Sequence, residues 1–168
     1  MSHKIDPSSK QRYTPSMNPA PHRQRRLDKL FDAAPCYFLT LCTKDREHHL
    51  NNDRIMQRVY DFTTDSFQRY GVYVDCFVLM PDHAHLIVTI SATSETTAGS
   101  WVKAFKAIVS NREFKWQSGF FDHVLRNDES RSEKWEYIRM NPVRAGLVSY
   151  ADEWPYSQQC NRRDGTTL

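Results

Sequence analysis

The sequence predicts an α+β fold of the ferredoxin-like, split βαβ type, with a four-stranded antiparallel sheet. The periodic segments follow the order strand, helix, strand, strand, helix, strand, helix. A short Pro81-Asp82 turn separates the second and third strands, as is typical of an antiparallel hairpin. Two amphipathic helical segments flank this hairpin, so we expect both helices on one face of the sheet. An extra C-terminal helix, which carries Tyr137, follows the last strand.

The first strand is predicted at residues 36–43, where a compact apolar run (CYFLTLCT) is consistent with burial on both faces. A helix is predicted at residues 54–70 because an Asn-Asn-Asp cap precedes it, apolar residues follow helical spacing, and Gly71 can end it. Two apolar, β-branched runs at residues 72–79 and 85–90 predict the two strands of the hairpin.

The second half of the chain repeats the alternation of helix and strand. A Ser/Thr-rich connector at residues 91–99 precedes a helix at about residues 100–115, whose apolar stripe includes Trp101 and Phe105. The last strand is predicted at residues 119–126. Residues 128–140 then have helical character, and a proline and a glycine close this final helix.

The chain of 168 residues, 39% of them hydrophobic, is long enough for one buried core and short for two. We therefore expect a single domain at residues 35–157. The preceding arm, residues 1–34, contains four prolines and few apolar residues and ends in a basic cluster, so we expect it to be flexible. Residues 158–168 form a C-terminal tail.

The net charge of +3 permits a polyanionic partner without requiring one. The four cysteines show no Cys-x-x-Cys spacing, which favours reduced, buried thiols and a cytoplasmic protein. No apolar run approaches about 18 residues, and the polar N-terminus lacks the hydrophobic core of a secretory signal. Membrane insertion and export are therefore not expected.

Two histidines, His83 and His85, stand at the start of the third strand in the sequence MPDHAHLIV. Because side chains alternate along a strand, both imidazoles face one way, while Leu86 and Val88 face the core. Two imidazoles on one face can hold a cation. Histidines are also common at sheet edges without a metal, so this spacing alone leaves both interpretations open.

A second candidate group lies in the sequence YIRMNPVRAGLV. Tyr137 and Asn141 are four residues apart, so one continuous helix would place them on the same face. If that face meets the hairpin, the Asn141 amide oxygen could join His83 and His85 around a divalent cation, with Tyr137 beside it as a nucleophile. Alone, Tyr137 is better explained as a core residue, and Asn141-Pro142 as a helix-ending turn. Their joint occurrence with the histidine pair favours the site.

Together these motifs resemble the REP-associated tyrosine transposases, within the single-tyrosine HUH transposase superfamily. The resemblance runs from about residue 37 to residue 157. It rests on four segments, MPDHAHLIV, GFFDHVLR, YIRMNPVRAGLV and EWPYS. His123, in the second segment, stands where the family pattern leans to arginine, which leaves the role of this histidine open.

The resemblance implies a metal-dependent endonuclease and strand transferase that acts on single-stranded DNA folded as short hairpins. Tyr137 matches the nucleophile that becomes linked to a 5′-phosphate. His83 and His85 match the histidine pair, and Asn141 falls where related enzymes place a third metal ligand. The ion would be Mg²⁺ or Mn²⁺, and the sequence does not choose between them. A monomer is favoured over a homodimer.

Basic residues near these motifs are candidates for sequence-independent contacts with DNA phosphates. In the domain they are Lys103, Lys106, Arg126, Arg139 and Arg144, and in the N-terminal arm they are Arg23, Arg25 and Arg26. Each has an alternative explanation as a solvated surface charge.

Two other functions are weighed against this one. A DNA-hairpin binding protein that keeps the fold without cleaving would form no covalent adduct. A phosphodiesterase that acts on small nucleotides or RNA through activated water would keep its activity after Tyr137→Phe. A non-cleaving binding protein has no chemical need for the combined histidines, tyrosine and asparagine. The spread of basic residues beyond one pocket argues against the phosphodiesterase.

Overall fold

A five-stranded antiparallel sheet forms the centre of the protein, with strand order β4-β1-β3-β2-β5. The computed structural model describes residues 34–125 and 128–159. The strands are β1 (Cys36–Cys42), β2 (Val72–Leu79), β3 (His83–Ile90), β4 (Phe121–Leu125) and β5 (Ser157–Gln159). The α+β fold class is confirmed, with one strand more than predicted. The extra strand β5 has only three polar residues, Ser-Gln-Gln, and therefore carries no apolar alternation that a sequence could reveal.

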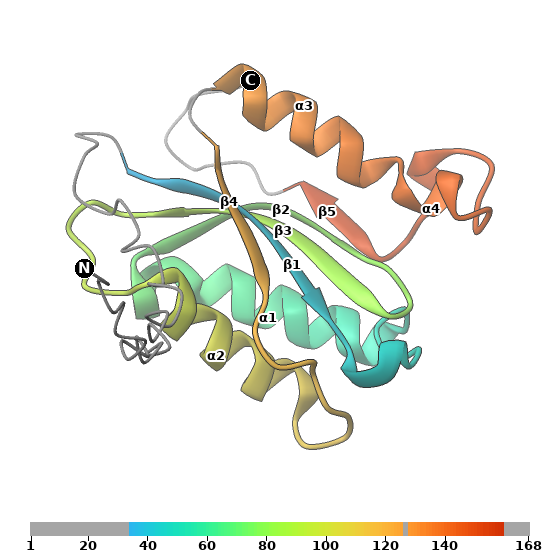
Figure 1. Cartoon of the computed structure of the whole chain (residues 1–168), viewed down its shortest axis with the longest axis horizontal. Coiled ribbons are helices and arrows are strands. Elements are labelled where there is room, and N and C mark those ends of the chain that lie inside the picture. The colour runs from blue at the N-terminus through green and yellow to red at the C-terminus, as the bar shows by residue number, and fades with distance from the viewer. Residues whose placement is uncertain (1–33, 126–127, 160–168) are drawn as a thin grey trace, which may run out of the picture.

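Helices cover both faces of the sheet (Figure 1). The helices are α1 (Asp53–Tyr70), α2 (Ala98–Ser110), α3 (Asp128–Arg139) and α4 (Asn141–Arg144), with short 3-10 turns η1 (Lys44–Arg46) and η2 (Ala151–Glu153). Helices α1 and α2 lie together on one face, as predicted for the split βαβ unit. The extra helix α3 lies on the opposite face with α4, and it carries Tyr137, as predicted.

The larger hydrophobic core lies between the sheet and the pair α1 and α2. Trp101 and Phe105 of α2 are almost fully buried there, and the Trp101 indole N–H donates to the Ser66 hydroxyl of α1 at 2.7 Å. The Asn52 side chain caps α1 by accepting from the Ile55 N–H. This core accounts for the amphipathic spacing that predicted both helices.

The smaller core lies on the other face of the sheet, beneath α3. Ile138 of α3 is fully buried there, and Trp135 packs against the same cluster. Trp154, which follows η2, is also buried and donates its indole N–H to the Leu79 carbonyl oxygen at 2.9 Å. This core holds the C-terminal helices against the strands that carry the histidines.

The predicted end of the helix at about residues 100–115 is wrong. Helix α2 ends at Ser110, because Asn111 and Arg112 adopt left-handed backbone conformations (φ 43° and 65°). The helix predicted at residues 128–140 is confirmed to within one residue, since α3 ends at Arg139, and Met140 separates it from the one-turn helix α4.

Cys36, Cys42 and Cys76 are free thiols, as predicted for the cysteines that the structure describes. No helix in the described parts of the chain has both the length and the apolar character needed to cross a membrane.

Candidate active site

A tight turn positions the first histidine. The Met80 N–H donates to the His83 carbonyl oxygen at 2.8 Å, which closes the β2–β3 hairpin around Pro81 and Asp82. Thr43, which follows β1, donates its hydroxyl to the Asp82 carbonyl oxygen at 2.9 Å and fixes the turn to the neighbouring strand. The predicted hairpin is confirmed, and β3 begins at His83 itself.

His83 and His85 lie on the face of the sheet that α3 covers, with ring centroids 4.8 Å apart. His83 Nδ1 bonds the Asp82 carboxylate at 2.6 Å, and His85 Nδ1 bonds the Thr40 hydroxyl at 2.9 Å. With the hydrogen on Nδ1, each ring keeps a lone pair on Nε2. Histidines that ligate metals are usually oriented in this way, through a partner on the other ring nitrogen.

His85 is electrically neutral near pH 7. Burial is the main cause that lowers the pKa of His85 to about 3, and the positive charges of Lys134 and Arg46 act in the same direction. The neighbouring carboxylate stays ionised. Partial burial acts to raise the pKa of Asp82, but the hydrogen bond from His83 and the charge of Arg46 lower it overall. A histidine must be neutral to bind a metal, and His85 is in that state near pH 7.

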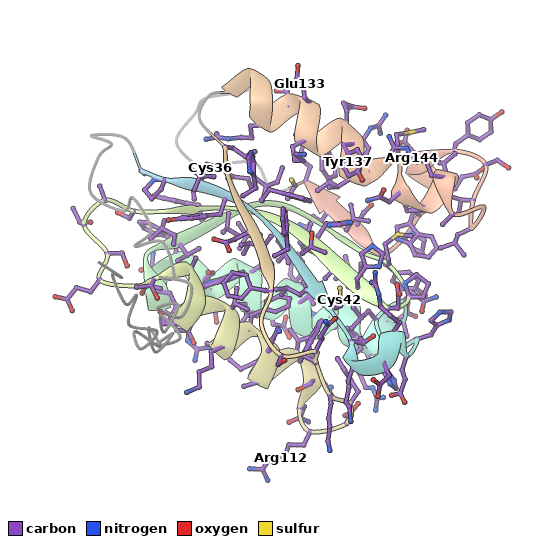
Figure 2. All side chains as sticks on the ribbon, in the orientation of Figure 1. Cys36, Cys42, Arg112, Glu133, Tyr137 and Arg144 are labelled. Atoms are coloured by element: carbon purple, nitrogen blue, oxygen red, sulfur yellow. The ribbon has the colours of Figure 1, made fainter. Side chains whose placement is uncertain are left out.

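Helix α3 carries Tyr137 on its flank. Its neighbour Ile138 faces the sheet and is fully buried, whereas the Tyr137 side chain is 49% exposed. Two cations lie over the Tyr137 ring, Lys134 Nζ at 5.2 Å and Arg144 Cζ at 4.7 Å from its centroid. Figure 2 shows Tyr137 and Arg144 side by side in the helical layer. Two positive charges beside a phenol oxygen are placed to stabilise the negative charge of a bound phosphate.

Lys134 links the tyrosine to the histidine pair. Its Nζ lies 5.0 Å from the centroid of Phe38 in β1. The Phe38 ring stacks on His85, with centroids 5.3 Å apart and an interplanar angle of 25°. A continuous set of contacts therefore runs from His85 through Phe38 and Lys134 to Tyr137.

Asn141 begins α4, so it does not share one uninterrupted helix with Tyr137. Arg144 nevertheless connects the two residues. Its Nη1 donates to the Tyr137 carbonyl oxygen at 2.8 Å and to Asn141 Oδ1 at 3.3 Å. Asn141 Nδ2 is buried and has no hydrogen-bond partner among the described residues. The amide is therefore held weakly, by one long hydrogen bond.

The donor types fit a manganese or magnesium ion. Within residues 34–125 and 128–159, no three His, Cys, Asp or Glu side chains are grouped to hold a metal. Asn141 is the third ligand that the sequence predicts beside His83 and His85, and its amide oxygen is a hard ligand that suits either ion. Its unpartnered nitrogen and long hydrogen bond leave the amide available to reorient.

Comparison with known proteins identifies the family. The family described as IS200-like transposases matches residues 35–140, a range that contains both histidines and Tyr137. The chain belongs to the IS200-like transposase family.

This IS200-like transposase is 29% identical over 86 residues to the REP-associated tyrosine transposase of Escherichia coli (strain K12), a match that covers 50% of this chain and 52% of that protein. It is also 26% identical over 144 residues to an uncharacterised protein of Haemophilus influenzae, covering 64% and 79% of the two chains. The solved structure of a REP-associated tyrosine transposase bound to a REP hairpin superposes with a TM-score of 0.62 at 21% identity, covering 77% of this chain and 79% of that one. The resemblance inferred from the motifs is confirmed, and the structural likeness shows a shared fold.

The basic residues predicted for phosphate contacts lie in different parts of the fold. Arg144 lies at Tyr137, as described above. Arg139 forms ion pairs with Glu136 at 2.9 Å and Asp152 at 3.0 Å, so much of its charge is compensated. Four other predicted residues lie outside the described parts of the chain: Arg126, Arg23, Arg25 and Arg26.

Lys103 and Lys106 lie on α2, which covers the face of the sheet opposite Tyr137. The Lys106 ammonium group donates to the Gln117 carbonyl oxygen at 2.8 Å and to that of Gly119. Lys106 therefore holds the segment that leads into β4. Neither lysine contacts the candidate site.

Lys134, which contacts both Phe38 and Tyr137, is not predicted by any motif in the sequence. As an isolated lysine in a polar helix it carries no motif, and its place depends on how α3 packs over Phe38. One signal was available, because Lys134 precedes Tyr137 by three residues and so shares its helix face. The orienting partners Thr40 and Asp82 were also missed, and Thr40 could be found only from the β1–β3 register, in which it pairs with His85.

Proposed function

We propose that this transposase is a metal-dependent endonuclease and strand transferase that acts on single-stranded DNA hairpins through a 5′-phosphotyrosine intermediate. The observation that carries the proposal is the oriented histidine pair. His83 and His85 each have a hydrogen-bond partner on Nδ1 and lie on the face covered by the helix of Tyr137, so Nε2 can ligate a metal when the ring hydrogen is on Nδ1. The relative solved in complex with a REP hairpin supports a DNA hairpin as the partner.

Tyr137 acts as the nucleophile in this mechanism. Its Oη attacks the phosphorus of a phosphodiester, and the bond from phosphorus to the 3′-oxygen breaks. The tyrosine loses one proton and the leaving oxygen gains one, so the products are a 5′-phosphotyrosine and a free 3′-hydroxyl. Attack by a 3′-hydroxyl on the phosphotyrosine reverses the step and joins strands. Lys134 and Arg144 stabilise negative charge on the phenolate and the phosphate.

His83, His85 and Asn141 would hold Mn²⁺ or Mg²⁺ in this proposal. The bound ion would polarise the phosphodiester as a Lewis acid. Titration calorimetry with Mn²⁺ tests the site independently of activity. His85→Ala should weaken Mn²⁺ binding strongly, whereas His123→Ala, which removes an exposed histidine from the same face of the sheet, should leave it unchanged.

The function is tested with labelled single-stranded hairpin DNAs from the genomic neighbourhood of the gene, incubated with protein and Mn²⁺ or Mg²⁺ and separated by denaturing electrophoresis. Wild-type protein should form a denaturant-resistant adduct, and Tyr137→Phe should form none. Tyr60→Phe is the matched control, since it removes a hydroxyl from a similarly exposed tyrosine on α1.

Tight hairpin binding without an adduct or a nicked product would favour a non-cleaving hairpin-binding protein. Equal product formation by wild type and Tyr137→Phe would instead favour a phosphodiesterase that uses activated water. Either result would remove Tyr137 from the role of nucleophile.

A further inference from the structure

The most exposed phenylalanine of the described chain lies close to the histidine pair. Phe121, the first residue of β4, is 60% exposed. It pairs with Thr40 of β1, and Thr40 in turn pairs with His85 of β3. Cross-strand partners in an antiparallel sheet point to the same face. Phe121 therefore occupies the same face as His85, two strands away.

Ring contacts join Phe121 to the candidate site. Its ring meets Phe38 edge-on, with centroids 6.5 Å apart, and Phe38 stacks on His85. His123 pairs with Phe38 and is also exposed, so two exposed rings stand two residues apart on this face of β4. The positive charge of Lys134 lies over Phe38. An exposed aromatic surface beside a cation is the combination that binds single-stranded nucleic acid, and sheet faces in several nucleic-acid-binding folds use aromatic rings in this way.

We infer that Phe121 is a stacking platform for an unpaired nucleobase of the DNA strand that enters the site. This inference rests on the proposed function and adds to it a contact with a base, next to the contacts with the phosphate. Among the described residues Phe121 lies on an edge strand of the sheet, and its side chain is 60% exposed. Stacking on a phenyl ring is sequence-tolerant, so this platform would hold a base without selecting its identity.

The test measures hairpin affinity in EDTA, so that cleavage does not contribute. Hairpins with unpaired 5′ and 3′ flanks are prepared with a single abasic nucleotide at each flank position in turn. Phe121→Ala should weaken binding of the intact DNA by about tenfold to a hundredfold. At one flank position the abasic DNA should bind wild type and Phe121→Ala equally, because the base that stacks is already absent. Phe121→Trp should restore the affinity.

Phe67→Ala is the matched control, because Phe67 is an exposed phenylalanine (38%) on α1, on the other side of the sheet, and its loss should leave affinity unchanged. Unchanged affinity of Phe121→Ala would overturn the inference, as would a loss of affinity that is the same for every abasic DNA. A change in oligomeric state of Phe121→Ala in light scattering would overturn it as well, by showing that a second copy of the chain covers the ring.

The adduct assay on the same DNAs separates this inference from the proposed function. Only the stacking platform is overturned if wild type forms the Tyr137-linked adduct but no abasic DNA binds wild type and Phe121→Ala equally. If one abasic DNA does bind both proteins equally and no adduct forms, the platform is supported and the nuclease proposal fails.

Discussion

His85 is held in a neutral state by its surroundings. The ring is 8% exposed, its Nδ1 is bonded to Thr40, and Phe38 stacks on it. Burial, with the positive charges of Lys134 and Arg46, lowers its pKa to about 3 from an ordinary value of 6.5. Because this pKa differs from that of an exposed histidine, the free energy of unfolding should depend on pH.

In metal-free protein, stability should fall as the pH drops from about 6.5 towards about 3. The unfolded chain takes up a proton at His85 before the folded chain does, so acid favours unfolding. One proton changes the free energy of unfolding by about 1.4 kcal/mol per pH unit, so the loss between pH 6.5 and pH 5 should be about 2 kcal/mol. His85→Gln should remove this part of the pH dependence in urea unfolding with EDTA.

His123→Gln serves as the control for this measurement, since it removes an exposed histidine and should retain the wild-type pH dependence. The same acid dependence in wild type and His85→Gln would show that His85 titrates normally and is not desolvated in the folded protein.

Lys134 is the residue that most directly joins the tyrosine to the histidine side of the site. Lys134→Gln should slow adduct formation by roughly tenfold to a hundredfold, because one preorganised charge that stabilises the phenolate and phosphate is lost. Lys134→Arg should retain most of the rate. The rate is measured by single-turnover kinetics on a labelled hairpin at saturating protein.

Lys103→Gln is the matched control, because it makes the same change of charge on α2, on the opposite face of the sheet. An equal slowing by Lys103→Gln and Lys134→Gln would mean that overall charge, and not the position of Lys134, governs the rate.

At the scale of secondary structure, α3 depends on few apolar contacts among its described side chains. Its composition is mostly polar, and over residues 131–139 the one fully buried side chain is Ile138, with Trp135 partly buried beside it. Ile138→Ala should lower the free energy of unfolding by about 2 to 4 kcal/mol, because the truncation leaves a cavity beneath the helix. Urea unfolding followed by circular dichroism measures this loss.

Ile108→Ala on α2 gives the comparison, since Ile108 is 39% exposed and its truncation should cost less than about 1 kcal/mol. Similar losses for the two variants would indicate that α3 is held mainly by its polar contacts.

The elements differed in how well the sequence could predict them. The hairpin, α1 and β1 follow from apolar periodicity and from caps, which are local signals. The early end of α2 depends on two left-handed residues without glycine, and β5 depends on pairing with β2, so neither has a local signature. The position of Lys134 beside Tyr137 and Phe38 depends on tertiary packing, so no sequence motif predicts it.

At the scale of the molecule, positive charge on the two faces of the sheet has different roles. Arg144 lies at the tyrosine, whereas Lys106 bonds backbone carbonyls of the segment before β4. Arg144→Gln should weaken hairpin binding and reduce the slope of log affinity against log salt by about 1, because one phosphate contact is lost. Fluorescence anisotropy across a salt series measures both quantities.

Lys103→Gln, on the far face, should change neither the affinity nor the slope. If Lys103→Gln also reduced the slope of log affinity against log salt, DNA would contact both faces of the sheet and would not be confined to the face of Tyr137.

The segment that carries Tyr137 is attached at both edges of the sheet, because β4 precedes it and β5 follows it. The buried Trp154 indole, bonded to the Leu79 carbonyl, reinforces the second attachment. In the proposed mechanism, a DNA end linked to Tyr137 would therefore be joined to a segment that is held at both edges of the sheet. Such a double anchorage would favour exchange between DNA ends that are brought to the enzyme over transport of one end to a distant target.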